Sequence, residues 1–372
     1  MLKLSERCNL ACPHCFVFEM ADQSWRSKPA RMSETTVAAT AERIAEHARR
    51  HSLAGVKVFF HGGEPLLAGA GTIVAAATVI REALPSGVQV EIGVQTNGVL
   101  LREPLLRAFL EAGIRVGVSL DGSASQHDRH RRFRDGTGSH SAVSAGLTLL
   151  TRMPYREIFS GLLCTVDVAN APVEMYEALL EFAPPAIDFL LPHGNWTTPP
   201  PLRTNEPAQT PYADWLITVF DRWYTAPQRA TGIRLFEEIL SLTLGGPSRI
   251  EAVGLSPVGL IVVDTDGSIE QVDALKSAYD GAAGLGLNVA ADSFDTALAH
   301  PAIAARQIGV AALCDTCRAC SIRDVCGGGH FAHRYRAGEG YRNPSVFCPD
   351  LLRLIGHIRG RVEQDALALL ST

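Results

Sequence analysis

Several features are missing from this sequence of 372 residues, and each absence excludes a class of protein. No apolar run approaches about 18 residues, so we expect no membrane span. There is no basic block, and 34 basic against 39 acidic residues give a net charge of −5, which argues against a dedicated nucleic-acid binder. The N-terminal segment 1–7 lacks the apolar core of a signal peptide, so we predict a cytoplasmic protein. With 47% hydrophobic and 20% charged residues, the composition is that of a folded globular chain.

The nine cysteines are too few and too clustered for a disulfide scaffold. Three lie between Cys8 and Cys15, five lie between Cys314 and Cys348, and Cys164 stands alone. In a reducing compartment, tight clusters are typical of metal or cofactor ligands rather than of bridges. We interpret Cys164, in an apolar segment, as a core residue.

The first half of the chain repeats one unit: a short apolar strand, a polar or glycine-rich turn and a helix. This alternation predicts an α/β fold with a parallel sheet and right-handed crossovers. Six units are too few for an eight-unit barrel, so we predict a partial, TIM-like (β/α)6 barrel. Ser33 is the expected N-cap of the first helix, and Gly113 the expected stop of the third. The predicted strands are 2–4, 56–60, 88–94, 115–120, 160–166 and 187–191, and the predicted helices are 35–51, 73–84, 103–112, 142–153 and 173–182.

This rhythm ends after residue 191, where three successive prolines, 199–201, force an extended stretch. Two aromatic helices, a hairpin turning at Asp266-Gly267, a cysteine-rich segment and a closing helix follow; we place them at 211–224, 233–244, 259–272, 314–348 and 351–370. The predicted segments are a barrel, a helical bridge, a cysteine-rich domain and a C-terminal helix, with the bounds 1–192, 193–250, 251–350 and 351–372.

Directly after the first predicted strand, Cys8, Cys12 and Cys15 place three thiols in eight residues. Structural zinc sites usually take four ligands in paired units. Three cysteines instead suit a 4Fe–4S cluster with one open iron, which can bind an external chelating ligand. A partial zinc site or a loop with unpaired thiols is the alternative.

Polar or glycine-rich turns follow the next three predicted strands. Taken singly, each is an ordinary turn. Together they lie at the carboxyl ends of parallel strands, where barrel active sites are built. They are 61–65, 95–98 and 119–122.

These features resemble the radical S-adenosylmethionine (SAM) superfamily. The resemblance implies that the three cysteines hold the cluster and that its open iron chelates the amino and carboxylate groups of SAM. It also implies that Gly62, Gly63 and Glu64 meet the methionyl amine; two glycines allow close backbone approach, and a carboxylate suits an amine.

Four further SAM contacts follow from the same resemblance. Ser119 and Asp121 would lie near the ribose or the reactive carbon, with Asn97 close by. The basic run 127–131 resembles a family turn whose arginine pairs with the SAM carboxylate, so this role passes to Arg131. The alternative for this run is a solvated loop.

The second cysteine group supplies four thiols beside the Gly327–Gly329 run. It resembles the SPASM extension of radical SAM enzymes that modify peptides and proteins, so residues 251–350 are expected to form a SPASM/twitch-type iron–sulfur domain. Full versions carry seven cysteines for two auxiliary clusters, whereas the stretches 256–259 and 271–273 lack cysteine here and His330 replaces another. We therefore expect one auxiliary 4Fe–4S cluster on Cys317, Cys320, Cys326 and Cys348.

Two questions about this second group stay open. Cys314 is a spare thiol or an alternative ligand. A zinc site with four sulfurs is the rival to the cluster.

A closer resemblance, along nearly the whole chain, is to FxsB-type radical SAM/SPASM peptide maturases, which form three-residue cyclophanes. It implies that a 5′-deoxyadenosyl radical removes a β-hydrogen from a ribosomal precursor peptide and that the carbon radical then attacks an aromatic ring, in RiPP maturation. A small reductant such as flavodoxin or ferredoxin would supply the first electron. The stretches that look alike are 21–26, 161–167, 188–193, 211–216, 265–271 and 333–336.

Rearomatisation needs a base, and Asp273 is the candidate, because it corresponds to an aspartate that serves as base in SPASM-bearing sulfatase maturases. A hairpin-end or capping aspartate is the alternative reading of Asp273. The alternative functions are a thioether-forming or sulfatase-activating maturase and, from a different class, a zinc-stabilised peptide-binding module.

Overall fold

The computed structural model describes residues 1–203, 206 and 209–370. Ten strands form one sheet in the order β10-β9-β8-β1-β2-β3-β4-β5-β6-β7. Their bounds are β1 Leu2–Ser5, β2 Gly55–Gly62, β3 Gln89–Thr96, β4 Ile114–Ser119, β5 Phe159–Thr165, β6 Ala186–Leu190, β7 Gly232–Ile233, β8 Val262–Val263, β9 Ser268–Glu270 and β10 Gly284–Asn288.

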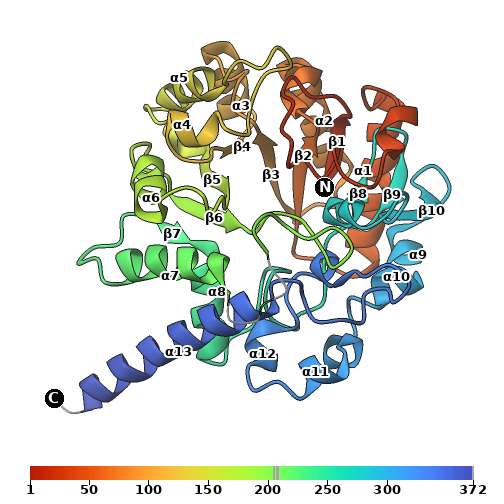
Figure 1. Cartoon of the computed structure of the whole chain (residues 1–372). Helices are drawn as coiled ribbons and strands as arrows, with labels where there is room; N and C mark the ends of the chain where they lie inside the picture. The colour runs from red at the N-terminus through yellow and green to blue at the C-terminus, as the bar shows by residue number, and fades with distance from the viewer. Residues whose placement is uncertain (204–205, 207–208, 371–372) are drawn as a thin grey trace.

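Strands β1 to β6 are parallel neighbours in chain order, and each is followed by a helix. Figure 1 shows these strands as an open arc with the helices on its outer side. The predicted partial (β/α)6 barrel is therefore confirmed. The helices are α1 Glu34–Arg50, α2 Ala70–Ala83, α3 Glu103–Glu111, α4 Ala124–His127, α5 His140–Leu150 and α6 Pro172–Leu180.

The predicted helix signals act as expected. Ser33 accepts a hydrogen bond at its side chain from the backbone N–H of Thr36 (3.1 Å), which satisfies one free donor at the start of α1. Gly113 follows the end of α3 with φ of +60°, a conformation that glycine adopts without strain.

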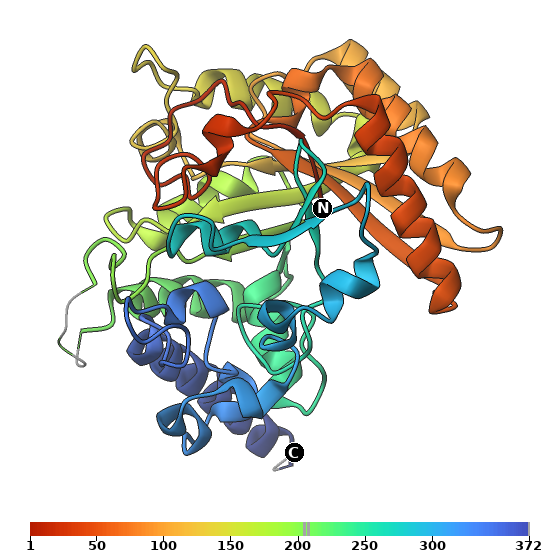
Figure 2. The same cartoon turned by 90° about the vertical axis from the view of Figure 1, so that its right-hand side faces the viewer.

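The C-terminal half packs against the open side of the barrel (Figure 2). Within this half, the carboxylate of Asp350 accepts hydrogen bonds from the backbone N–H groups of Tyr212 and Ala213 (both 3.0 Å), and so caps the N-terminus of helix α7 (Pro211–Tyr224). Its helices are α7 Pro211–Tyr224, α8 Arg234–Thr243, α9 Phe294–Leu298, α10 Pro301–Ala304, α11 Asp315–Arg318, α12 Arg323–Cys326 and α13 Cys348–Leu370. The end of the predicted C-terminal segment, 371–372, lies outside the described residues.

The predicted hairpin at 259–272 is present but shorter, as β8 and β9 turning at 264–267. Strand β8 pairs with β1 in parallel, so the hairpin continues the barrel sheet across the predicted domain boundary. The sequence did not predict β7 and β10. Strand β7 has only two residues, and glycines interrupt β10, so neither shows the alternation of apolar and polar residues that indicates a strand.

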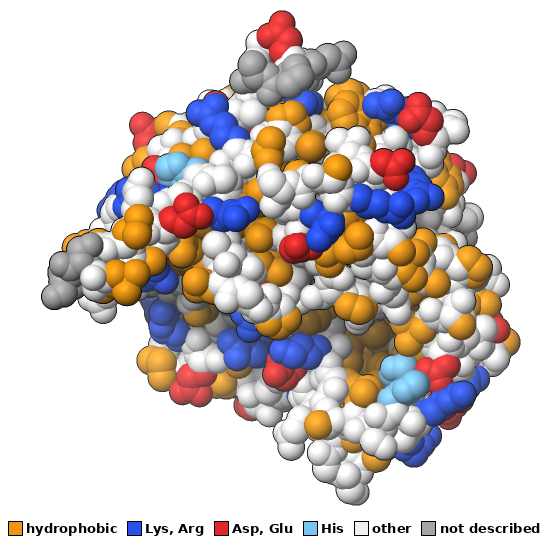
Figure 3. Space-filling view, turned by 90° about the horizontal axis from the view of Figure 1, so that it is seen from below, with side chains coloured by type: hydrophobic (Ala, Val, Ile, Leu, Met, Phe, Trp, Pro, Cys, Tyr) orange, Lys and Arg blue, Asp and Glu red, His pale blue; other side chains and the backbone are white. Residues whose placement is uncertain are grey.

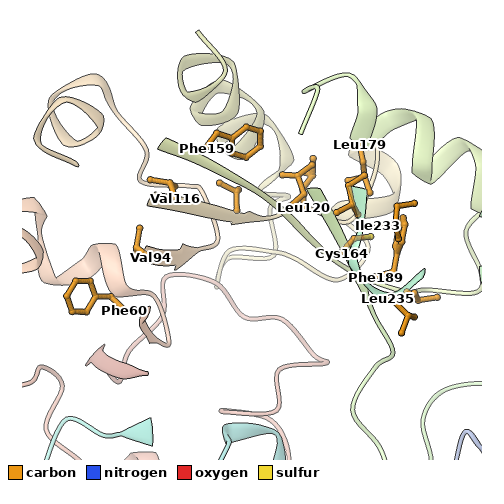
Figure 4. Packing of buried hydrophobic residues seen from close by; sticks show 14 of the residues in the cluster. Phe60, Val94, Val116, Leu120, Phe159, Cys164, Leu179, Phe189, Ile233 and Leu235 are labelled. Atoms are coloured by element: carbon orange, nitrogen blue, oxygen red, sulfur yellow. The ribbon is translucent and has the colours of Figure 1, made fainter. Parts of the chain in front are cut away.

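The core lies between the sheet and its helices. Figure 4 shows Phe60, Val94 and Val116 on neighbouring strands and Cys164 further round the sheet. All four side chains are buried, and the interpretation of Cys164 as a core residue agrees with its sulfur contact to Met175 (3.5 Å).

On the face seen from below, basic and acidic side chains are interspersed rather than gathered by sign (Figure 3). In the described part of the chain, no helix has the length and apolar character needed to cross a membrane.

We predict that Trp223→Ala destabilises the bridge between the two halves by about 3–5 kcal/mol, because it empties a fully buried site. The variant also leaves the carbonyl of Thr231 without the indole N–H that now donates to it at 2.8 Å. Chemical denaturation checks the value. Leu244→Ala, at a side chain 74% exposed, is the control and should change stability by less than about 0.5 kcal/mol.

Candidate functional site

The loop that carries the first three cysteines is pinned to the barrel at two places. The backbone N–H of Ala11 donates to the carbonyl of Arg132 (2.8 Å), and that of Gly63 donates to the carbonyl of Ser5 (2.8 Å). Gly62 has φ of +131°, and a Cβ there would lie 2.1 Å from the Ser5 oxygen. Only glycine therefore allows the turn after β2 to approach the start of the cysteine loop this closely.

Eight of the ten residues predicted for the first cluster and SAM line one cavity of about 250 Å³. The cavity lies at the carboxyl ends of the strands, as a barrel active site should. The three thiols and the Arg131 guanidinium suit a cluster and the carboxylate that would bind beside it. The eight are Cys8, Cys12, Cys15, Gly62, Gly63, Asn97, Ser119 and Arg131.

Glu64 is placed behind the cavity wall rather than in it. Its carboxylate accepts from the hydroxyl of Thr96 (2.7 Å) and from the backbone N–H groups of Asn97 (2.8 Å) and Leu66 (2.9 Å). Burial raises the pKa of Glu64 to about 7, although these three donors oppose the rise. The Glu64 side chain thus fixes the turn at Asn97. Because it does not line the cavity, it is not placed to contact the amino group of SAM directly.

Asp121 is also buried outside the cavity, and it holds Arg131. The Arg131 Nε donates to Asp121 Oδ2 at 2.5 Å, and Asp121 Oδ1 accepts from the backbone N–H of Thr165 at 2.9 Å. Burial alone would raise the pKa of Asp121, but Arg131 lowers it below its usual value. The pair therefore stays charged and fixes the guanidinium in the cavity wall, where it can meet a carboxylate.

The four cysteines predicted for the auxiliary cluster line a second, small cavity of about 50 Å³. Gly327 adopts φ of +59° and approaches so closely that a Cβ would lie 1.7 Å from the Gly254 oxygen. Arg334 donates to the carbonyls of Gly327 (2.7 Å) and Gly329 (2.6 Å), which fixes this turn beside the thiols. Cys314 does not line the cavity, but it lies beside Cys317.

The spacing of the sulfurs bears on the choice of metal. Within the described residues, the one set of three metal-binding side chains with all ligand atoms within 4.8 Å of one another is His47, His51 and Asp295. In a tetrahedral site with Zn–S bonds of about 2.3 Å, sulfurs lie about 3.8 Å apart. Neither cysteine group is that compact. A four-iron cluster spreads its thiolates over different irons, so both groups fit a cluster better than zinc.

His330 is separate from the thiol cavity. It belongs to a third cavity, of about 200 Å³, together with His193 and His333. The ring centroids of these three histidines are 5.0–5.5 Å apart, and burial lowers the pKa of each, to about 4 for His193. All three are therefore neutral near pH 7.

Asp273 is 5% exposed and does not line the SAM cavity; its Oδ1 lies 2.8 Å from Lys3 Nζ. Lys3 was not among the predicted functional residues, although a lysine inside an apolar strand is a usable signal. His61 and His193, which both line the SAM cavity, were not predicted either.

Comparison with known proteins agrees with this geometry. Residues 2–168 match the sequence profile of the radical SAM superfamily. The matched stretch is a radical SAM domain. This radical SAM domain covers five of the six barrel strands, β1 to β5, and with the curated relatives below it marks the chain as an enzyme.

Two of these relatives are anaerobic sulfatase-maturating enzymes. The chain is 25% identical to the cysteine-type enzyme of Clostridium novyi over 276 residues, covering 72% of this chain and 71% of the relative. It is 25% identical to the serine-type enzyme of Klebsiella aerogenes over 351 residues, covering 91% and 80%.

Two solved structures show the same fold. Native anSMEcpe with bound AdoMet and Cp18Cys peptide superposes with a TM-score of 0.84 at 21% identity, covering 99% of this chain and 98% of that one. Streptococcus suis SuiB bound to precursor peptide SuiA gives 0.56 at 12% identity, covering 93% and 74%. The radical SAM domain and the C-terminal half are thus arranged relative to each other as in these solved structures.

We predict that anaerobically reconstituted protein holds about eight irons per chain, in two clusters of four. Replacing Cys8, Cys12 and Cys15 by alanine should remove about half of the iron, and so should replacing the auxiliary cysteines, because each group is expected to hold one cluster. Iron analysis measures this. Cys164→Ala is the matched control and should keep the full iron content; zinc in place of iron would contradict both cluster assignments.

Proposed function

We propose that the chain is a radical SAM maturase that oxidises a residue of a peptide or protein substrate at its β-carbon. The observation that supports this most directly is that two cavities share a wall. Leu190, Leu191 and His193 line both the SAM cavity and the cavity of His193, His330 and His333, here called the histidine-lined cavity. The far side of the histidine-lined cavity comes from the C-terminal half, with Ala274 and Leu351. A substrate side chain bound there would lie directly beside the SAM site.

SAM bound at the first cluster supplies, after one-electron reduction, a 5′-deoxyadenosyl radical that removes a hydrogen atom. The chain contributes position and shielding. Arg131, held by Asp121, orients the SAM carboxylate, and the apolar wall of Phe16, Leu190 and Leu191 excludes water from the reacting atoms.

The oxidation must then remove one electron and one proton from the substrate radical. The cysteine site at Cys317, Cys320, Cys326 and Cys348 is proposed as the electron acceptor. Asp273 is proposed as the group that finally holds the proton, because it belongs to a buried group of charges in which carboxylates outnumber ammonium groups. These are Glu6, Asp264, Glu270 and Asp273 against Lys3, Lys28 and Lys276. The position of His330 in the histidine-lined cavity supports a single auxiliary cluster.

The relatives support one product type more than another. The sulfatase-maturating enzymes support oxidation of a cysteine or serine, the alternative in the sequence analysis, better than they support cyclophane formation. A carbon–carbon crosslink to an aromatic ring in a ribosomal precursor peptide is the second candidate. The rings of Phe189, His193 and His333 around the histidine-lined cavity could pack against an aromatic side chain.

We predict that reduced, reconstituted enzyme releases 5′-deoxyadenosine faster when its peptide is present, because substrate binding orders the cavity. A peptide deuterated at the β-carbon should pass one deuterium to the nucleoside. Mass spectrometry separates the products: an oxidised cysteine or serine supports a sulfatase-activating role, and loss of two hydrogens mapped to an aromatic ring supports a cyclophane.

The variant with alanine at all three loop cysteines is the control for this assay and should release no nucleoside. Processing of a peptide by that variant would contradict the proposed function outright.

A further inference from the structure

A group of metal-binding side chains joins the barrel to the C-terminal half outside the cavities described above. His47 lies in the last turn of α1, His51 is the C-terminal cap of the same helix, and Asp295 lies in α9. None of these three residues lines the SAM cavity, the histidine-lined cavity or the four-cysteine cavity. The proposed function therefore gives them no role.

One carboxylate oxygen faces both imidazole rings. Asp295 Oδ1 lies 2.7 Å from His47 Nδ1 and 2.8 Å from His51 Nε2. The two histidines are one helical turn apart, so their rings lie on the same side of α1, with centroids 4.4 Å apart. Ligand atoms of all three residues lie within 4.8 Å of one another. This spacing allows one ion to contact all three side chains.

Neighbouring side chains hold this arrangement in place. Arg50 Nε pairs with the other carboxylate oxygen of Asp295, Oδ2, at 3.1 Å, which leaves Oδ1 facing the rings. One turn earlier on α1, Arg43 Nε donates to the carbonyl of Val289 at 3.0 Å. Two arginines of α1 thus hold the segment that follows β10. A carboxylate oriented by such an outer partner is typical of metal sites.

The donor atoms select the class of ion. Two imidazole nitrogens and one carboxylate oxygen suit zinc, whereas magnesium and calcium prefer oxygen ligands alone. In a tetrahedral zinc site the ligand atoms lie about 3.4 Å apart, so each ring must move outward by about half an ångström. The side chains of His47 and His51 are 24% and 46% exposed, which permits this movement and gives water access as a fourth ligand.

We propose that His47, His51 and Asp295 bind one zinc ion, which clamps α1 of the barrel to α9 of the C-terminal half. Each ring binds through the nitrogen that faces Oδ1 and carries its proton on the other nitrogen. Without the ion, only contacts between partly exposed side chains join these groups, and such contacts contribute little to stability. The zinc is structural and separate from the iron of both cysteine groups.

The test counts zinc in the anaerobically reconstituted holoenzyme by equilibrium dialysis against zinc chloride and elemental mass spectrometry. We expect about one zinc per chain, and affinity at least about tenfold lower in each of His47→Asn, His51→Asn and Asp295→Asn, with iron content unchanged. His357→Asn is the matched control. His357 Nε2 also faces an aspartate, Asp221 Oδ1 at 2.8 Å, but lies outside this group, so the variant should bind zinc like the unchanged enzyme.

Amide hydrogen exchange separates a clamp from an ion held loosely at the surface. With free zinc tenfold above its dissociation constant, exchange in residues 289–298 should slow by about tenfold, because this segment opens only when the ion is released. Zinc should not change the exchange of this segment in His47→Asn. Magnesium chloride at the same concentration should not slow it in the unchanged enzyme, because the donor atoms disfavour that ion.

Zinc that binds His47→Asn and His51→Asn as tightly as the unchanged enzyme overturns the site, because other groups, such as free thiols, then hold it. Zinc binding without slower exchange at 289–298 overturns the clamp. If either histidine variant does not retain its iron, Asp295→Asn decides, and undiminished binding there overturns the site. These outcomes do not depend on release of 5′-deoxyadenosine, so failure of the zinc site is distinguishable from failure of the proposed function.

Discussion

A single buried ammonium group, that of Lys3, ties the two halves of the molecule together. It lies on the first barrel strand and pairs with Asp264 and Asp273 of the C-terminal half. Removing one partner of such a buried pair typically costs about 3–5 kcal/mol, because the other charge is left without compensation. The parallel pairing of β8 with β1 depends on the same contact region, so the sheet and the charges fix one geometry together.

The arrangement of the cavities follows from this junction. Because the hairpin is anchored beside β1, the C-terminal half closes the open side of the barrel and forms the far wall of the histidine-lined cavity. The cysteine loop lines the SAM cavity on the barrel side and is held there by the close approach of Gly62 to Ser5. A substrate residue between the halves would be enclosed by both, which is the condition for protecting a radical from water.

Local patterns predicted much of this. The strand–helix rhythm placed six strands to within about two residues, a normal boundary error, and the cysteine spacings identified two groups of residues that the structure brings to two cavities. Glu64 and Asp121 were expected in the SAM cavity, but burial and backbone donors hold them behind its wall. Sequence cannot show on which side of a turn a carboxylate lies.

The role of Lys3 could not be predicted for a related reason. Lys3 finds Asp264 and Asp273 more than 250 residues away in the chain, and no local period carries such a contact. Long-range charge pairs require the folded sheet before they exist.

The same junction separates the two charges that leave the substrate in the proposed reaction. Neutral histidines line the cavity between the barrel and the C-terminal half, and their burial disfavours any cation there. The cluster around Lys3 has one carboxylate in excess of its ammonium groups, so an added proton is stabilised there rather than among the histidines. The proposed acceptor of the electron is at the four-cysteine cavity, which shares no lining residue with the other two cavities among the described residues. In the proposed reaction, proton and electron would therefore go to different sites, which opposes their recombination with the substrate radical.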